Sequence, residues 1–150
     1  MRSVKFSESI TINRPPELVF DYTQDYTSRL KWDTFLQKAD ILYGATTAAK
    51  GVKTYCKAKN GLGMETEYIT FNRPKATAIQ MTKGPYLFNT FLGSWTFRDI
   101  DKNTTYVMFL YSFSLRFPFS LATPFVKYIL RNNVKTRLLD LKKCMEASNL

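Results

Sequence analysis

Between residues 39 and 115 the sequence alternates β-type segments with short breaker runs, and no long helical period interrupts them. The breaker runs, such as Asn60-Gly61-Leu62-Gly63 and Asn72-Arg73-Pro74, have the length and residue types of hairpin turns. Because short connections join antiparallel neighbours, this pattern predicts an antiparallel meander. The six predicted strands are Ala39–Tyr43, Gly51–Lys57, Met64–Phe71, Ala76–Thr82, Asn89–Ile100 and Thr104–Leu115.

A seventh strand is predicted at the start of the chain, from Ser3 to Ile12. Apolar residues occupy every second position of this segment except Glu8, which breaks the pattern. The run Asn13-Arg14-Pro15-Pro16 ends the strand, because proline suits the first turn of a helix better than a sheet. Two short helices are predicted to follow, with bounds Glu17–Tyr22 and Asp25–Phe35, and with Leu30 and Trp32 partly buried in the second.

One long amphipathic helix is predicted at the end of the chain, from Thr123 to about Ala147, with Pro124 in its first turn. A helix of this length spans roughly 36 Å. In the alternative interpretation the helix begins near Phe119 and Pro124 kinks it. The apolar stripe, at spacings of three and four, consists of Val126, Leu130, Val134, Leu138, Leu141 and Met145.

Aromatic residues make up 15% of the chain, and in the last two predicted strands they gather on one face of the sheet. The residues on that face are Phe91, Trp95 and Phe97, and then Val107, Phe109, Tyr111 and Phe113. The aromatic face therefore predicts either a packed core or the wall of a ligand pocket.

The composition excludes several classes of catalytic and metal site. The 150 residues contain no histidine, which removes Ser-His-Asp and Cys-His catalysis and histidine-ligated metals. Cys56 and Cys144 lie far apart in the sequence, with neither zinc-type spacing nor a CxxC redox motif, so we expect two reduced thiols. We therefore expect no metal and no cofactor, and a single domain over residues 1–150 without internal repeats.

The net charge of +10 gives the chain a basic surface. Such a surface is compatible with nucleic acid, with an anionic membrane, or with solubility alone. The sequence has no RNP-like, KH-like or zinc-finger pattern, which disfavours nucleic acid. The longest apolar run, Tyr106–Tyr111, is much shorter than the ~20 residues of a membrane span. With no signal-peptide pattern at the N-terminus, we expect a cytoplasmic protein.

Three local runs carry a recognisable pattern: Ser9-Ile10-Thr11-Ile12, Pro16-Glu17-Leu18-Val19-Phe20-Asp21-Tyr22 with Asp25 and Trp32, and Gly93-Ser94-Trp95-Thr96-Phe97. These runs resemble the START-like, birch-pollen-allergen-like superfamily (SRPBCC), in particular its polyketide cyclase/dehydrase-type branch. The order of elements fits too, and the resemblance covers nearly the whole chain. It implies an α+β helix-grip fold, in which a curved seven-stranded antiparallel sheet wraps a long C-terminal helix and leaves a hydrophobic cavity.

Three functions follow as expectations. The first is binding, and possible transport, of a hydrophobic small molecule or lipid in the cavity. The second is cyclase/dehydratase-type catalysis on a polyketide-like or aromatic ligand in the same cavity. The third is a basic adaptor that contacts nucleic acid or an anionic membrane. The family has no shared catalytic set, so the resemblance assigns no catalytic residue, and neither enzymatic activity nor the oligomeric state is predicted.

The predicted ligand-binding residues come from the predicted strands, from the second short helix, from the Lys83–Phe88 loop and from the long helix. They are Glu8, Trp32, Glu67, Ile69, Phe71, Met81, Tyr86, Phe88, Phe91, Trp95, Phe97, Phe109, Tyr111, Phe113, Phe125 and Ile129. A carboxylate inside an apolar cavity would have a raised pKa and could act as a general acid or base. In the alternative, Glu8, Glu65 and Glu67 lie near strand ends, pair with basic residues, or follow a bulge that reverses the alternation.

Two loop regions have the composition of an entrance to the cavity. The segment from Arg116 to Tyr128 mixes aromatic and basic residues, which suit the interface of a bilayer. In the alternative interpretation it is a hydrophobic plug between the last strand and the helix. The Lys83–Phe88 loop has a similar composition and is a candidate lid.

Overall fold

The computed structural model describes residues 3–147 and contains one seven-stranded sheet. The strands lie in the order β1-β7-β6-β5-β4-β3-β2, and every neighbouring pair is antiparallel. The predicted antiparallel meander is therefore confirmed, and the structure adds that the N-terminal strand β1 pairs with β7. The bounds are β1 Val4–Ile12, β2 Leu36–Ile41, β3 Lys53–Ala58, β4 Gly63–Asn72, β5 Ala76–Lys83, β6 Phe88–Asp101 and β7 Thr104–Leu115.

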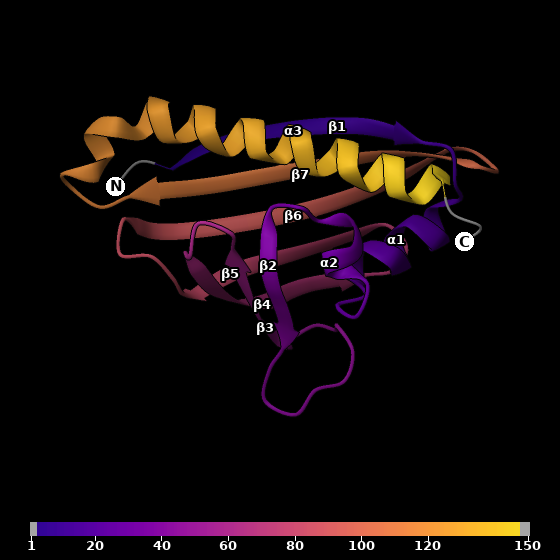
Figure 1. Cartoon of the computed structure of the whole chain (residues 1–150), viewed down its shortest axis with the longest axis horizontal. Coiled ribbons are helices and arrows are strands. Elements are labelled where there is room, and N and C mark those ends of the chain that lie inside the picture. The colour runs from indigo at the N-terminus through magenta and orange to yellow at the C-terminus, as the bar shows by residue number, and fades with distance from the viewer. Residues whose placement is uncertain (1–2, 148–150) are drawn as a thin grey trace.

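The helices occupy two places around the sheet (Figure 1). Helices α1 (Pro16–Gln24) and α2 (Arg29–Trp32) follow β1, and α3 (Thr123–Ala147) runs the length of the molecule beside β1 and β7. A 3-10 turn, η1 (Phe119–Ala122), leads into α3. This arrangement, a curved antiparallel sheet around one long helix, is the predicted helix-grip fold.

The second short helix is much shorter than predicted. Instead of a helix from Asp25 to Phe35, the chain forms a turn in which the Asp25 carboxylate accepts hydrogen bonds from Thr27 N and Ser28 Oγ, both at 3.0 Å. This local bonding competes with the helix, as is typical of Asp in a turn. Leu30 is exposed rather than partly buried, while Trp32 is buried in the core.

The core lies between the aromatic face of the sheet and the helices. The predicted face is confirmed, because its members on β6 and β7 are all buried. Their rings meet mainly edge to face: the centroids of Trp95 and Phe109 are 4.4 Å apart at 90°. Gly93 makes room for Tyr111, since a Cβ at position 93 would lie 3.1 Å from the tyrosine ring.

Helix α3 packs on this core with only its second half. Val134, Leu138, Leu141 and Met145 are at most 2% exposed, whereas Val126 and Leu130 are only partly buried. The predicted stripe is thus one continuous face, but its first two members do not reach the depth of the other four. Beneath this first half of α3 lies a cavity.

Candidate functional site

A cavity of about 360 Å³ lies between the sheet and the first half of α3. Its wall is mainly apolar, which is typical of small-molecule sites. The apolar lining comes from the sheet, from the loops near β2, β3 and β6, and from α3. These residues are Phe35, Leu36, Ala58, Leu62, Met64, Ile79, Pro85, Leu87, Phe88, Phe91, Trp95, Phe109, Val126, Ile129 and Leu130.

The cavity opens to solvent at the end where α3 begins. Among its lining residues, Leu62 and Ile129 are 53% and 42% exposed, and Leu87 and Val126 are partly buried. These residues belong to the β3–β4 hairpin, the β5–β6 loop and α3. The mouth therefore has an apolar rim formed by two loops and a helix.

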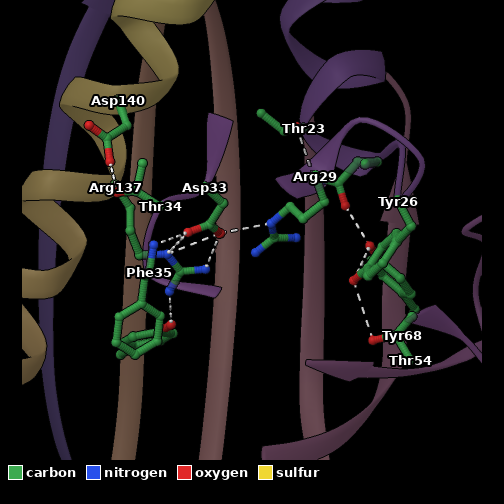
Figure 2. Close-up of polar contacts among 12 residues, drawn as sticks. Thr23, Tyr26, Arg29, Asp33, Thr34, Phe35, Thr54, Tyr68, Arg137 and Asp140 are labelled. Carbon is green, nitrogen blue, oxygen red and sulfur yellow. Dashed lines mark hydrogen bonds and ion pairs between the residues drawn. The ribbon is translucent and has the colours of Figure 1, made fainter. Parts of the chain in front are cut away.

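Another part of the wall is polar and charged, and Figure 2 shows its contacts. Asp33, which is fully buried at the end of α2, accepts a hydrogen bond from Nε of Arg29 at 2.9 Å and another from Nη2 of Arg137 at 2.9 Å. Nη1 of Arg137 donates to the Tyr111 hydroxyl at 2.8 Å. This cluster joins α2, α3 and β7, and both arginines line the cavity.

The two arginines keep Asp33 ionised. Burial by itself would raise the pKa of this carboxyl, but the charges and hydrogen bonds of Arg137 and Arg29 outweigh burial and lower the pKa below its ordinary value. The pKa values of both guanidinium groups are raised by Asp33, against the opposing effect of their own burial. The cluster is therefore charged at every physiological pH.

A second polar chain crosses the wall beside Arg29. The Tyr68 hydroxyl donates to Oε1 of Gln24 at 2.7 Å, and the Tyr26 hydroxyl donates to Oγ1 of Thr54 at 3.3 Å. Gln24, Tyr26 and Tyr68 line the cavity, as does Thr66, whose hydroxyl is 3.0 Å from that of Thr54. Burial raises the pKa values of Tyr26 and Tyr68, so both phenols are neutral near pH 7.

Six of the sixteen residues expected at the ligand line the cavity: Phe88, Phe91, Trp95, Phe109, Tyr111 and Ile129. They come from β6, β7 and the first half of α3. Four of them, Phe91, Trp95, Phe109 and Tyr111, belong to the aromatic alternation of the last two strands.

Eight other members of that set lie outside the cavity lining. Trp32, Phe97 and Phe113 are buried in the filled core, and Phe71 and Met81 pack against it. Ile69, Tyr86 and Phe125 are 37%, 74% and 66% exposed. The alternation along a strand separates inside from outside, but it does not separate a cavity wall from a filled core.

Glu8 faces α3 rather than the cavity. It shares the face of Phe6 on β1, but the helix passes over this strand, and Glu8 Oε1 lies 3.0 Å from Nε of Arg131 and 3.6 Å from Nζ of Lys135. This is the pairing with basic residues that the sequence analysis left open.

A different cause places Glu65 and Glu67 outside the lining. Thr66 and Tyr68 point inward on β4, so both glutamates point the other way. The register of β4 against β5 shifts between Tyr68 and Thr70, and this bulge returns Phe71 to the inner face. Glu65 instead accepts hydrogen bonds from the hydroxyls of Tyr43 and Thr82.

The charged cluster is the part of the site that the sequence reasoning missed. The sequence did indicate an inward position for Arg137, because this residue lies three positions after Val134 and four before Leu141, on the inner face of the helix. Arg29 and Asp33 had none, because the turn that orients α2 was itself predicted to be helical. Cys56, which also lines the cavity, is a free cysteine whose pKa is raised by burial.

Residues 3–147 lack two further classes of feature. No group of three or more His, Cys, Asp or Glu side chains is placed to hold a metal ion in this part of the chain. No helix within the same residues is both long and apolar enough to cross a bilayer.

Known structures share this fold at low sequence identity. A START superfamily protein from Mycobacterium smegmatis matches with a TM-score of 0.81 at 11% identity, over 95% of this chain and 97% of that one. The Zhui aromatase/cyclase from Streptomyces sp. R1128 matches with a TM-score of 0.82 at 12% identity, over 97% and 94%. Major latex-like protein 151 from Panax ginseng matches with a TM-score of 0.72 at 11% identity, over 94% and 96%.

Sequence comparison gives the family directly. The comparison with curated proteins found no match. The family model described as polyketide cyclase/dehydrase and lipid transport, in contrast, matches residues 3–146, which is nearly the whole chain. The resemblance noted in the sequence is thereby confirmed, and the chain belongs to the polyketide cyclase/dehydrase and lipid transport family.

Proposed function

We propose that the protein binds a hydrophobic small molecule in the cavity beneath the first half of α3. The observation that carries this proposal is the cavity itself: about 360 Å³, mainly apolar, and open at one end. Close packing is the normal state of a protein interior, and unfilled apolar space lowers stability. A ligand that fills the space recovers those contacts. The family description, which names both cyclases and lipid transport, supports this class of ligand.

The polar wall suits binding by hydrogen bonds. Tyr26 and Tyr68 line the cavity with phenols that are neutral near pH 7, since burial raises pKa values whose ordinary level is already about 10. A few fixed polar groups at one end of an apolar pocket orient a ligand without contributing most of its affinity. The binding role therefore accounts for both parts of the wall.

Tryptophan fluorescence tests the proposal with a neutral probe, N-phenyl-1-naphthylamine. Trp95 lines the cavity, and the ring centroid of Trp32 lies 6.2 Å from that of Trp95. Both indoles should therefore transfer energy to a probe in the cavity, and titration should quench their emission to saturation at one probe per chain. Absence of saturable quenching would overturn the proposal.

A variant that fills the cavity provides the matched control. Ala58 lines the cavity near its mouth, so Ala58→Phe has room to place a ring inside it. This variant should lose most of the probe affinity. Ala78→Phe, which adds the same ring on β5 at a residue outside the cavity lining, should retain it. Equal affinities in both variants would show that the probe binds elsewhere.

A second function is favoured by the surface around the mouth. The described residues between 117 and 129 include six large apolar side chains that are 42–78% exposed: Phe117, Phe119, Leu121, Phe125, Tyr128 and Ile129. Arg116 lies beside this apolar face, 5.1 Å from the ring of Tyr86, and its N–H donates to the carbonyl of the cavity residue Leu87. An exposed apolar face of this kind normally contacts a partner.

The occupant we propose for this face is an anionic membrane surface, because the chain carries a net charge of +10 and aromatic side chains suit the bilayer interface. Co-sedimentation should show binding to vesicles that contain phosphatidylglycerol and much weaker binding to pure phosphatidylcholine. Phe125→Ser should reduce sedimentation, and Leu139→Ser, an exposed residue in the second half of α3, should not. Equal loss in the two variants would contradict this role.

A further inference from the structure

The charged cluster in the cavity wall carries more positive charge than the fold neutralises. Arg29 and Arg137 are each 7% exposed and both line the cavity, yet they share one carboxylate, that of Asp33. The cluster therefore holds two positive charges and one negative charge away from bulk water. A buried charge without a full counter-charge is costly, so this surplus calls for an anion.

The positive charge that the cluster does not neutralise lies on Arg29. All three nitrogens of the Arg137 guanidinium donate hydrogen bonds, Nε and Nη2 to Asp33 and Nη1 to Tyr111. Arg29 donates only through Nε, and within residues 3–147 its Nη1 and Nη2 donate none (Figure 2). Two strong donors in the cavity wall are thus available to a ligand.

The aromatic rings around Arg29 hold its guanidinium in place. The carbon Cζ lies 5.1 Å from the ring centroid of Trp32 and 5.7 Å from that of Tyr26. Together with the Asp33 hydrogen bond, these contacts fix the plane of the group before any ligand arrives. Donors that are already ordered lose little entropy on binding, which favours recognition over non-specific attraction.

We infer that Nη1 and Nη2 of Arg29 bind a single carboxylate at one end of an apolar ligand, an inference that rests on the proposed function. The two terminal nitrogens of a guanidinium match the two oxygens of a carboxylate. One negative charge balances the surplus of the cluster, whereas a phosphate monoester carries roughly −1.5 to −2 and exceeds it. The ligand is then an apolar acid whose body fills the space between β6, β7 and α3.

Calorimetric titration of the unmodified protein with dodecanoate, dodecanol and dodecyl phosphate, all below their micelle concentrations, tests this inference. The three share one apolar chain and differ in the head group. We expect dodecanoate to bind at least tenfold more tightly than the other two. Equal or tighter binding of dodecanol would overturn the inference while leaving the proposed function intact. Tighter binding of dodecyl phosphate would overturn the claim of a singly charged group, and binding of none would overturn the proposed function as well.

The variant Arg29→Met assigns the preference to one side chain. It removes both terminal donors and leaves Asp33 paired with Arg137. The tenfold preference for dodecanoate over dodecanol should disappear, because dodecanoate loses the larger share of its affinity. Arg131→Met, which removes the same charge from an exposed pair with Glu8, should keep the preference. Loss of the preference in both variants would mean that the general charge of the surface selects the acid. If Arg29→Met does not fold, the three titrations of the unmodified protein still decide.

Discussion

The two halves of α3 have the same amphipathic pattern but different surroundings. Residues 134–147 supply the buried side chains of the helix, and Arg137 in this half pairs with Asp33. Residues 123–133 supply none, and they cover the cavity and carry the exposed Phe125 and Tyr128. Packing thus holds one half of the helix to the core, while the other half covers the cavity. A regular stripe predicts which side of a helix faces inward, and not how tightly that side is packed.

The largest expected effect comes from breaking the buried cluster of Arg29, Asp33 and Arg137, which anchors the second half of α3. Asp33→Asn leaves Arg29 and Arg137 buried without their counter-charge, and such a change costs about 3–5 kcal/mol of unfolding free energy. Urea denaturation at neutral pH measures this loss. Asp21→Asn, in a pair with Arg73 whose two side chains are about half exposed, should cost at most about 1 kcal/mol. A similar cost for both variants would show that the buried cluster is not an anchor.

The Asp33 carboxyl also makes the free energy of unfolding depend on pH in the acid range. Because its folded-state pKa is lowered, Asp33 contributes stability above its unfolded pKa, which is about 3.9, and loses this contribution as the pH falls through the folded value. The unfolding free energy should therefore decline below about pH 4 in the unmodified protein and decline less in Asp33→Asn. Identical acid profiles would contradict the assignment.

The next effect compares one leucine from each half. Leu138 is 2% exposed in the filled core, so Leu138→Ala should cost about 2–5 kcal/mol. Leu130 faces the cavity, so part of its side chain has no packing partner to lose. Leu130→Ala should therefore reduce the free energy of unfolding by less than half as much. Denaturation of both variants measures the difference. Equal losses would mean that the two halves are packed alike.

The smallest effect concerns alkaline pH and the contact of α1 with the second half. The Tyr22 hydroxyl lies 3.1 Å from Sγ of Cys144, and burial, together with this contact, raises the pKa of Tyr22 to about 12. A raised pKa means that stability is present below the ordinary value near 10 and is lost as the pH rises towards 12. Tyr22→Phe should make the loss of stability between pH 9 and 12 less steep. Circular dichroism, which follows the folded fraction across this range, measures the difference. No change of slope would contradict it.

The fold could be predicted from the sequence because it depends on patterns that run over many residues. Thr104–Leu115 matches its strand residue for residue, and Thr123 begins the long helix as expected. Alternation with period two and a stripe with spacings of three and four are properties of whole segments, so a single bulge or turn does not hide them. The family resemblance added the order in which these segments pack.

The cavity lining could be predicted only where the alternation of neighbouring strands gathers aromatic side chains on one face, as it does at Trp95 and Tyr111. The rest depends on single local events that alternation does not report. The register shift after Tyr68 is one of these, and the turn at Asp25 that orients Arg29 and Asp33 is another. Whether a buried position borders a void or a neighbour depends on the curvature of the sheet, which no single residue encodes.

The most direct test of a ligand cavity beneath one half of α3 is a nuclear magnetic resonance titration of ¹⁵N-labelled protein with dodecanoate. The account predicts that amide shifts concentrate in residues 125–133, in the β3–β4 hairpin and at the Trp95 indole, and that residues 138–145 barely respond. Shifts spread equally over both halves of the helix, or none at saturating dodecanoate, would contradict it.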